Sequence, residues 1–253
     1  MLKIIRSRLQ QKSWTVAFPD AEPNLPAKFR GMPSIDDSAC GKDCGLCVKS
    51  CPVGALSCSG EGRISIDLGK CIFCGNCERE CGEGVIKFTR DYRLASCVRE
   101  GLIVGEAEFR LAEKLKKEML RLFGRSLKLR QVSAGGCNAC EADINVLSTI
   151  VFDLGRFGIQ FVASPRHADG ILVTGPISNN MALALEKTYA AIPSPKIVIA
   201  SGACAISGGP FIGHLDVKGG VDKLIPVDLY IPGCPPHPIT VLDGFLRLLG
   251  RVR

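Results

Sequence analysis

Twelve of the fourteen cysteines in this sequence fall in patterns suited to binding metal through thiolates. The most regular pattern is the run Cys71-x₂-Cys74-x₂-Cys77-x₃-Cys81. Three thiolates on one tight loop can bind three irons of a [4Fe-4S] cube, while the fourth thiolate reaches a neighbouring cube. Gly75 suits the tight turn within the run, because glycine adopts backbone conformations that other residues avoid. The run therefore indicates a site that binds iron–sulfur clusters.

A second run, Cys40-x₃-Cys44-x₂-Cys47-x₃-Cys51, has the same spacing except for one additional residue between its first two cysteines. Paired runs are typical of bacterial two-cluster ferredoxins, in which the last cysteine of each run binds the other cluster. The first cluster site is therefore expected to consist of Cys40, Cys44, Cys47 and Cys81. The second cluster site is expected to consist of Cys51, Cys71, Cys74 and Cys77. Because of the additional residue, Cys58 is an alternative to Cys40 as a ligand of the first cluster. If Cys58 is not a ligand, we expect both Cys58 and Cys97 to be small buried apolar residues.

Disulfides and zinc are the alternative uses for these cysteines. Residues 1–12 lack the uninterrupted apolar stretch of a signal peptide, and no segment approaches the ~20 apolar residues of a membrane span. We therefore expect a cytoplasmic chain, and cytoplasmic cysteines rarely form structural disulfides. Zinc sites typically use two separated cysteine pairs, whereas here a compact four-cysteine run occurs twice. Iron–sulfur clusters are favoured over both.

The net charge of +7 would ordinarily suggest an acidic partner such as nucleic acid. An oxidised [4Fe-4S] cube with its four thiolates carries about −2, so three cubes would bring +7 to about +1. Much of the basic excess then balances the clusters, and we expect no nucleic-acid partner.

Four more cysteines are spread over the C-terminal half, and we expect them to meet at one edge of a sheet. Apolar strands are expected over residues 126–133, 158–163, 170–174, 196–200 and 226–231, alternating with helices over residues 139–154, 179–191 and 238–249. This alternation is typical of a parallel sheet covered by helices, in which ligands bind beyond the carboxyl ends of the strands. Each cysteine follows a strand, which predicts a third site, the rim site, formed by Cys137, Cys140, Cys204 and Cys234.

The expected fold combines α+β and α/β architecture. A helix and a proline-rich extended arm occupy residues 1–39, a ferredoxin-like two-cluster domain occupies residues 40–105, and a connecting helix covers residues 106–125. A flavodoxin-like parallel-sheet domain occupies residues 126–253. The basic amphipathic helix over residues 1–11 is expected to pack on a partner or on its own domain, with a membrane interface as the alternative.

The C-terminal half resembles the small subunit of energy-converting, membrane-bound [NiFe]-hydrogenases of the formate hydrogenlyase type, and the related 20 kDa-type cluster subunit of respiratory complex I. The resemblance rests on Gly136-Cys-Asn-Ala-Cys-Glu141, on residues 164–176, on Ser201-Gly-Ala-Cys204 and on Pro232-Gly-Cys-Pro-Pro-His-Pro238. The first half resembles the ferredoxin-like subunit of the same complexes, including the arm at residues 29–36. The sequence therefore looks like a fusion of two neighbours in an electron-transfer chain.

The resemblance implies a proximal [4Fe-4S] cluster at the rim site, facing a large subunit that carries the [NiFe] centre. Cys137 and Cys140 are separated by two residues, which resembles hydrogenases more than complex I. The chain is then a non-catalytic electron-transfer subunit, held at the inner face of the cell membrane by other subunits and supplied by soluble ferredoxin or a formate dehydrogenase. The alternatives are a complex I-like enzyme that reduces quinone or sulfur compounds, and an iron–sulfur sensor or scaffold.

Two side chains beside the rim site have alternative roles. His237 either tunes the cluster by hydrogen bonding or packs the loop that carries Cys234. Glu141 either serves a proton path or interacts with the dipole at the start of a helix, which we favour.

Overall fold

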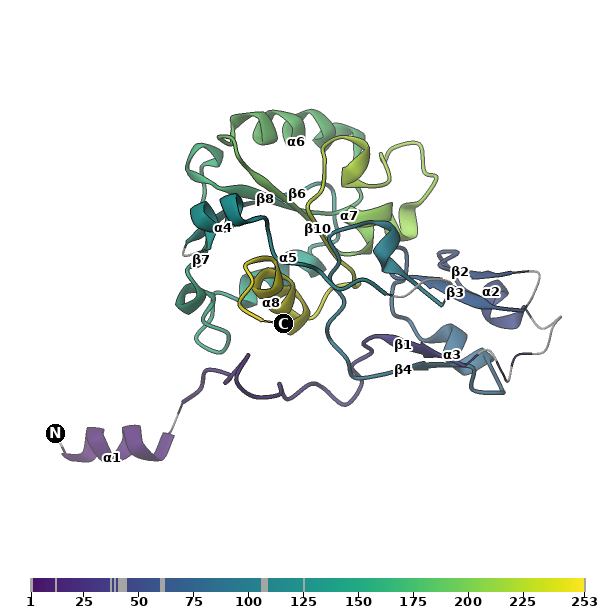
Figure 1. Cartoon of the computed structure of the whole chain (residues 1–253), viewed down its shortest axis with the longest axis horizontal. Coiled ribbons are helices and arrows are strands. Elements are labelled where there is room, and N and C mark those ends of the chain that lie inside the picture. Colours follow the sequence, from purple (N-terminus) through teal and green to yellow (C-terminus); the bar gives the residue numbers. More distant parts are fainter. Residues whose placement is uncertain are drawn as a thin grey trace.

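The computed structural model describes residues 2–11, 13–36, 38, 40, 45–59, 62–105, 109–124 and 126–252. A small half rich in cysteine packs against a larger α/β half, and the N-terminal helix stands away from both (Figure 1). One set of buried apolar side chains runs from Leu56 and Ile66 in the small half to Val173 and Ile206 in the large half. The two halves therefore share a core.

Two copies of one small unit build the cysteine-rich half. Helix α2 (Leu46–Ser50) leads to β2 (Leu56–Cys58), and α3 (Asn76–Glu80) leads to β4 (Ile86–Phe88), each 30 positions later (46 to 76, 56 to 86). Strand β1 (Pro33–Ile35) pairs with β4, and β3 (Ile64–Asp67) pairs with β2, both antiparallel. The matching pairs Ile35↔Ile86 and Ile66↔Leu56 give the two copies the same register. The duplication predicted from the cysteine runs is therefore present in the backbone.

The larger half contains a five-stranded parallel sheet. Its strands are β6 (Leu127–Ser133), β7 (Ile159–Phe161), β8 (Gly170–Thr174), β9 (Ile197–Ser201) and β10 (Leu229–Ile231). They lie in the order β7-β6-β8-β9-β10, and every neighbouring pair is parallel. Numbered along the chain this is 2-1-3-4-5, the flavodoxin-like order. The predicted fold class is confirmed.

Helices cover both faces of this sheet, because its strands are apolar on both sides. The first face packs against α5 (Ala139–Val146) and α8 (Pro238–Leu248), and the second against α6 (Asn179–Ala191) and α7 (Ala203–Ser207). Ile199 faces the first side and Val198 the second, as the two-residue period of a strand requires. The remaining short 3-10 helices are η3 (Leu154–Phe157), η4 (Pro165–His167), η5 (Gly209–Phe211) and η6 (Val221–Lys223).

The segment between the halves corrects one prediction. A helix was expected over residues 106–125, but α4 covers only Lys117–Phe123. The described residues 109–116 are not helical, because their amides bond to other segments: Ala112 N–H donates to Ala95 O (2.7 Å) and Leu115 N–H to Leu248 O (2.9 Å). Residues 106–108 and 125 lie outside the described residues.

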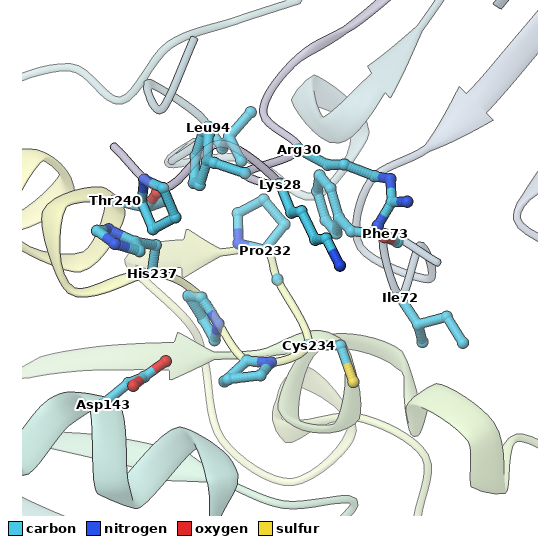
Figure 2. Close-up of a pocket in the computed structure, with 15 residues that line it drawn as sticks. Lys28, Arg30, Ile72, Phe73, Leu94, Asp143, Pro232, Cys234, His237 and Thr240 are labelled. Atoms are coloured by element: carbon cyan, nitrogen blue, oxygen red, sulfur yellow. Dashed lines mark hydrogen bonds between the residues drawn. The ribbon is translucent and has the colours of Figure 1, made fainter. Parts of the chain in front are cut away.

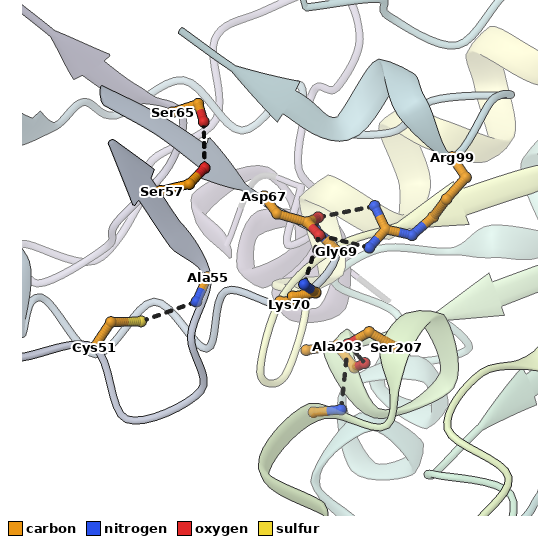
Figure 3. A network of polar contacts seen from close by, with 11 residues as sticks. Cys51, Ala55, Ser57, Ser65, Asp67, Gly69, Lys70, Arg99, Ala203 and Ser207 are labelled. Carbon is orange, nitrogen blue, oxygen red and sulfur yellow. Dashed lines mark hydrogen bonds and ion pairs between the residues drawn. The ribbon is translucent and has the colours of Figure 1, made fainter. Parts of the chain in front are cut away.

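Further contacts hold the halves together. Strand β5 (Ile103–Val104) follows the 3-10 helix η2 (Glu100–Leu102) and adds to β3, while Ser96 bonds to Tyr230 at the edge of the large sheet (2.8 and 3.0 Å). The Arg99 guanidinium donates to both oxygens of Asp67, at 2.8 and 2.7 Å, beside α7 (Figure 3). These contacts fix the loop that leads to Cys71, because Asp67 O also accepts the Cys71 N–H (2.9 Å).

The N-terminal segment crosses the molecule as an extended arm. Val16 N–H donates to Val151 O (2.8 Å), in the segment that follows α5. Helix α5 ends at Val146, eight residues before its predicted end at residue 154. Arg156 donates to the carbonyls of Val16 and Phe18, both at 2.8 Å. Helix α1 (Leu2–Gln11) precedes the arm, and none of its residues is buried. Among the described residues, no helix is long and apolar enough to cross a membrane.

Candidate iron–sulfur centres

Four loops at the carboxyl edge of the large sheet bring the rim-site cysteines together. Cys137 and Cys140 follow β6, Cys204 lies in α7 after β9, and Cys234 follows β10. The first two stand at the point where the strand order reverses, which is where ligands bind in this fold. The Cys140 thiol interacts electrostatically with Cys204, Cys234 and Cys137. Cys137 and Cys234 are exposed, so one side of the site is open.

At Gly202 the backbone passes too close to a rim-site thiol for a side chain to fit. Gly202 has φ +93°, and a Cβ built on it would lie 2.7 Å from Cys140 Sγ. Its N–H donates to Ile231 O (2.8 Å), and the next N–H, of Ala203, donates to Gly233 O (2.9 Å). These bonds join the loop of Cys204 to the loop of Cys234. A side chain at position 202 would therefore displace a thiol.

The electrostatics of the rim site favour a bound cation. Burial, followed by the charges of Cys234 and Cys137, raises the pKa of Cys204 to about 11. Burial also raises the pKa of Cys140, with further contributions from Glu141 and the other thiols. Four thiolates can therefore coexist here only when positive charge compensates them, as the irons of a cluster do. The buried Ser201 hydroxyl, next to Gly202, has no hydrogen-bond partner within the described part of the chain. The residues present therefore fit a cluster.

The second cluster site lies in the cysteine-rich half as a closed apolar hollow. Cys51 from the first run lines it with Cys71, Cys74 and Cys77 from the second run, and Phe88 and Leu56 close it. Cys71 Sγ accepts the Phe73 N–H (3.3 Å), and Cys51 Sγ accepts the Ala55 N–H (3.2 Å). Burial raises the pKa of Cys71 to about 12 and that of Cys77 to about 11. The structure thus brings together the four cysteines that the crossed pattern predicted.

The first cluster site is described in part, because Cys44 lies outside the described residues. Cys47 is buried in α2 as Cys77 is in α3, and Cys81 caps α3 as Cys51 caps α2. Cys40 is half-buried and packs against the shared core. It precedes Cys71 by 31 positions, the same shift that relates β1 to β3 (33 to 64). The repeat therefore makes Cys40 the counterpart of Cys71.

The thiols of the two remaining cysteines each donate to a backbone carbonyl. Cys58 was expected to be buried, but it is exposed at the end of β2, where its thiol donates to Ser59 O (3.5 Å). The two-residue period of a strand places Cys58 on the same face as buried Leu56, but Cys58 ends the short strand and does not reach the core. Cys97 is half-buried, and its thiol donates to Glu113 O (3.4 Å).

Glu141 and His237 are both fixed by hydrogen bonds. Glu141 is buried and accepts the Thr174 hydroxyl (2.6 Å). Burial raises its pKa, but hydrogen bonds from Ser133 and Thr174 outweigh this, so the pKa lies below its ordinary value. His237 Nδ1 accepts the Ile239 N–H (3.2 Å) and caps α8. These contacts join α5 to β8 through Glu141 and cap α8 through His237, and the functional roles of both side chains stay predictions.

A pocket of about 290 Å³ is lined both by residues of the loop at the second cluster site and by residues of the Cys234 loop. Figure 2 shows Ile72 and Phe73 of the second cluster site on one side and Pro232 and Cys234 on another. The arm residues Phe29 and Arg30 also reach this pocket, and the Phe29 ring packs edge-on against His237 (5.4 Å between centroids). No local pattern in the sequence marks these arm residues as part of a site. Their roles depend on contacts across more than 40 positions.

Comparisons with known proteins distinguish the same cysteine-rich half and α/β half. Residues 137–248 match the family described as NADH ubiquinone oxidoreductase, 20 kDa subunit, and residues 32–82 match the 4Fe-4S dicluster domain.

Three of the proteins that are similar to this chain come from hydrogenase and NADH-quinone oxidoreductase complexes. Formate hydrogenlyase subunit 7 of Escherichia coli is 46% identical over 54% of this chain and 53% of its own length. A probable membrane-bound hydrogenase subunit of Pyrococcus furiosus is 38% identical over 59% of this chain and 90% of its own. An NADH-quinone oxidoreductase subunit of Heliobacterium modesticaldum is 44% identical over 47% of this chain and 69% of its own. The chain thus spans about half the length of the first of these relatives.

Proposed function

Because this chain belongs to the family of the NADH ubiquinone oxidoreductase 20 kDa subunit, with a 4Fe-4S dicluster domain fused ahead of it, we propose that it is an electron-transfer subunit of a membrane-associated, hydrogenase-type oxidoreductase complex. The observation that carries the proposal is the meeting of Cys137, Cys140, Cys204 and Cys234 from separate loops at one rim. In this proposal the chain is a non-catalytic subunit. Its task is to hold electron carriers in a fixed order.

Three [4Fe-4S] clusters would occupy the first cluster site, the second cluster site and the rim site. Each bound cluster supplies one-electron redox chemistry at a potential set by its surroundings. The thiolates bind the irons, and the buried side chains around Cys71 and Cys77 exclude water from the second cluster site. Among the described residues, no three Cys, His, Asp or Glu side chains are placed to hold a single metal ion. The proposed sites are instead four-thiol cradles for a cube.

The arrangement supports an order of electron carriers along the chain. The pocket lined by Phe73 and Pro232 borders the loop of the second cluster site and the loop of Cys234, so electrons would pass between the cysteine-rich half and the large subunit through the rim site. The exposed thiols of Cys137 and Cys234 mark the face on which a large subunit carrying a [NiFe] centre would dock. A soluble ferredoxin or a formate dehydrogenase would supply the electrons. Other subunits would hold the complex at the inner face of the membrane.

A complex I-like enzyme that reduces quinone or a sulfur compound is the second candidate. The match of residues 137–248 to the ubiquinone oxidoreductase family and the likeness to the NADH-quinone oxidoreductase subunit of Heliobacterium modesticaldum favour it. Both candidates use the same three clusters and differ only in the centre that receives the electrons. The large subunit decides between them, because a hydrogenase needs a nickel site there.

Anaerobic purification of the full complex, with metal and acid-labile sulfide analysis of each subunit, tests the proposal. We expect about twelve irons per copy of this chain, from three four-iron clusters, and nickel only in the large subunit. Iron without nickel would favour the complex I-like candidate. A colourless protein, or zinc in place of iron and sulfide, would refute both.

A further inference from the structure

The backbone of the arm is fixed on both sides of Arg30. Gly31 N–H donates to Thr89 O and Met32 N–H donates to Asp91 O, both at 2.8 Å. On the other side, the Arg90 guanidinium donates to the carbonyls of Leu25 (2.5 Å) and Pro26 (3.2 Å). The Arg30 side chain therefore projects from an anchored segment.

This side chain lies on the loop that carries three thiols of the second cluster site. Its Nη1 donates to Phe73 O (3.4 Å), and Figure 2 shows Arg30 beside Phe73. A Cβ built on Gly75 would lie 2.6 Å from Arg30 Nε and 2.9 Å from its Cζ. The guanidinium thus covers the turn between Cys74 and Cys77.

No carboxylate in the described part of the chain forms an ion pair with this guanidinium. Lys28, which lines the same pocket, is exposed to solvent, whereas Arg30 is half-buried. The charge of Arg30 is therefore less screened than that of Lys28, and it acts on whatever the Phe73 loop holds.

The repeat shows that this contact is specific to one of the two N-terminal sites. Gly45 begins α2 as Gly75 begins α3, and both adopt the left-handed conformation (φ 54° and 75°). No described atom lies within 4 Å of a Cβ built on Gly45. At the position equivalent to Arg30, 31 residues later, the sequence has Glu61 (30 to 61), whose placement lies outside the described residues. The arginine therefore breaks the symmetry between the two sites.

We propose that Arg30 raises the reduction potential of the cluster at the second cluster site above that of the cluster at the first cluster site, an inference that rests on the proposed function. A cluster bound by four thiolates becomes more negative when it accepts an electron, so a nearby unpaired cation stabilises its reduced form. The second cluster site borders the pocket that leads to Cys234. Arg30 thus favours electron transfer from the first cluster to the second, which is the cluster beside the pocket that Cys234 lines.

The test replaces Arg30 in the full chain and measures each cluster by EPR-monitored redox titration under anaerobic conditions. A unit charge about 8 Å away, at an effective dielectric constant of about 30, changes a reduction equilibrium about tenfold. For Arg30→Met we expect a tenfold lower ratio of reduced to oxidised second cluster at a fixed potential, which corresponds to about 59 mV for one electron. The other two clusters change less than about twofold.

Three further variants separate charge from structure. Arg30→Lys keeps the charge and restores most of the potential, while Arg30→Gln keeps a donor for Phe73 O and still shows the full shift. Lys28→Met, in the same pocket, leaves the ratio of reduced to oxidised cluster at a fixed potential within about twofold of the wild type for all three clusters. The inference is overturned if Arg30→Gln behaves as the wild type, or if Arg30→Met leaves the second cluster unchanged or shifts all three clusters equally.

Iron content, measured on the same samples, separates this inference from the proposed function. About twelve irons with no shift in Arg30→Met overturns only the role of Arg30. The absence of clusters in the wild type overturns the proposed function.

Discussion

Replacing Cys51 by alanine tests whether the two cysteine runs exchange their last ligands. Cys51 belongs to the first run in sequence, but its thiol lines the hollow of Cys71, Cys74 and Cys77. The substitution removes one of four sulfurs there, and two of the remaining three are buried, at 7% and 6% exposure for Cys71 and Cys77. Water therefore cannot easily supply the missing ligand. The second cluster should be lost.

The expected magnitude follows from the cluster composition. One lost cube lowers the iron content from about twelve to about eight per chain, with an equal loss of sulfide. Cys58→Ala is the matched control, because Cys58 is exposed and its thiol bonds only to the adjacent Ser59 carbonyl among the described residues. It should retain about twelve irons.

Iron content alone does not show whether the two cysteine runs exchange their last ligands. The identity of the lost cluster does show it. If Cys51→Ala removes the second cluster, adding Arg30→Met leaves the reduction equilibria of the two remaining clusters within about twofold. In Cys81→Ala, which should lose the first cluster instead, Arg30→Met still produces its shift. The reasoning is refuted if Cys51→Ala retains twelve irons, if Cys58→Ala loses as many, or if the two backgrounds respond to Arg30→Met in the reverse way.

Two further substitutions test the rim site and the helix that follows it. Gly202→Ala places a Cβ 2.7 Å from Cys140 Sγ at φ +93°, so we expect EPR and iron analysis to show loss of the rim cluster only, from about twelve to about eight irons. Asp243→Asn leaves Arg247 buried without its carboxylate at 2.8 Å in α8, which should cost ~3–5 kcal/mol. At ~2–4 °C per kcal/mol for a chain of this size, thermal unfolding followed by circular dichroism should shift down by about 6–20 °C.

Each of these substitutions has a matched control. Gly213→Ala also has a positive φ, +81°, but no atom of the described residues lies within 4 Å of the built Cβ, so it should keep all three clusters. Arg93→Gln breaks the ion pair to Asp91, in which the side chains are 49% and 30% exposed, and should cost no more than ~1 kcal/mol. A Gly202→Ala protein with an unchanged rim-cluster signal, or an Asp243→Asn protein no less stable than Arg93→Gln, would contradict the structural argument.

The sequence determined the cluster runs and most of the α/β half, because both depend on local spacing. Three thiolates that bind one cube from a single run must lie on a tight loop, so the interval between Cys71, Cys74 and Cys77 indicates the chemistry by itself. Strand β8 and helix α6 have the predicted bounds, since their apolar residues follow one period from end to end. The convergence of the rim cysteines also followed from the rule that parallel strands end at one edge.

Only the tertiary structure decided features that depend on distant partners. Residues 109–116 have the apolar spacing of a helix, yet their amides bond to Ala95 and Leu248 instead. The exposure of Cys58 and the capping role of His237 depend on which neighbours each side chain meets. Arg30 lies 43 positions from Phe73, and no local period records that contact. Backbone hydrogen bonds and charges act through space, so a sequence pattern predicts them only where the partner is also nearby along the chain.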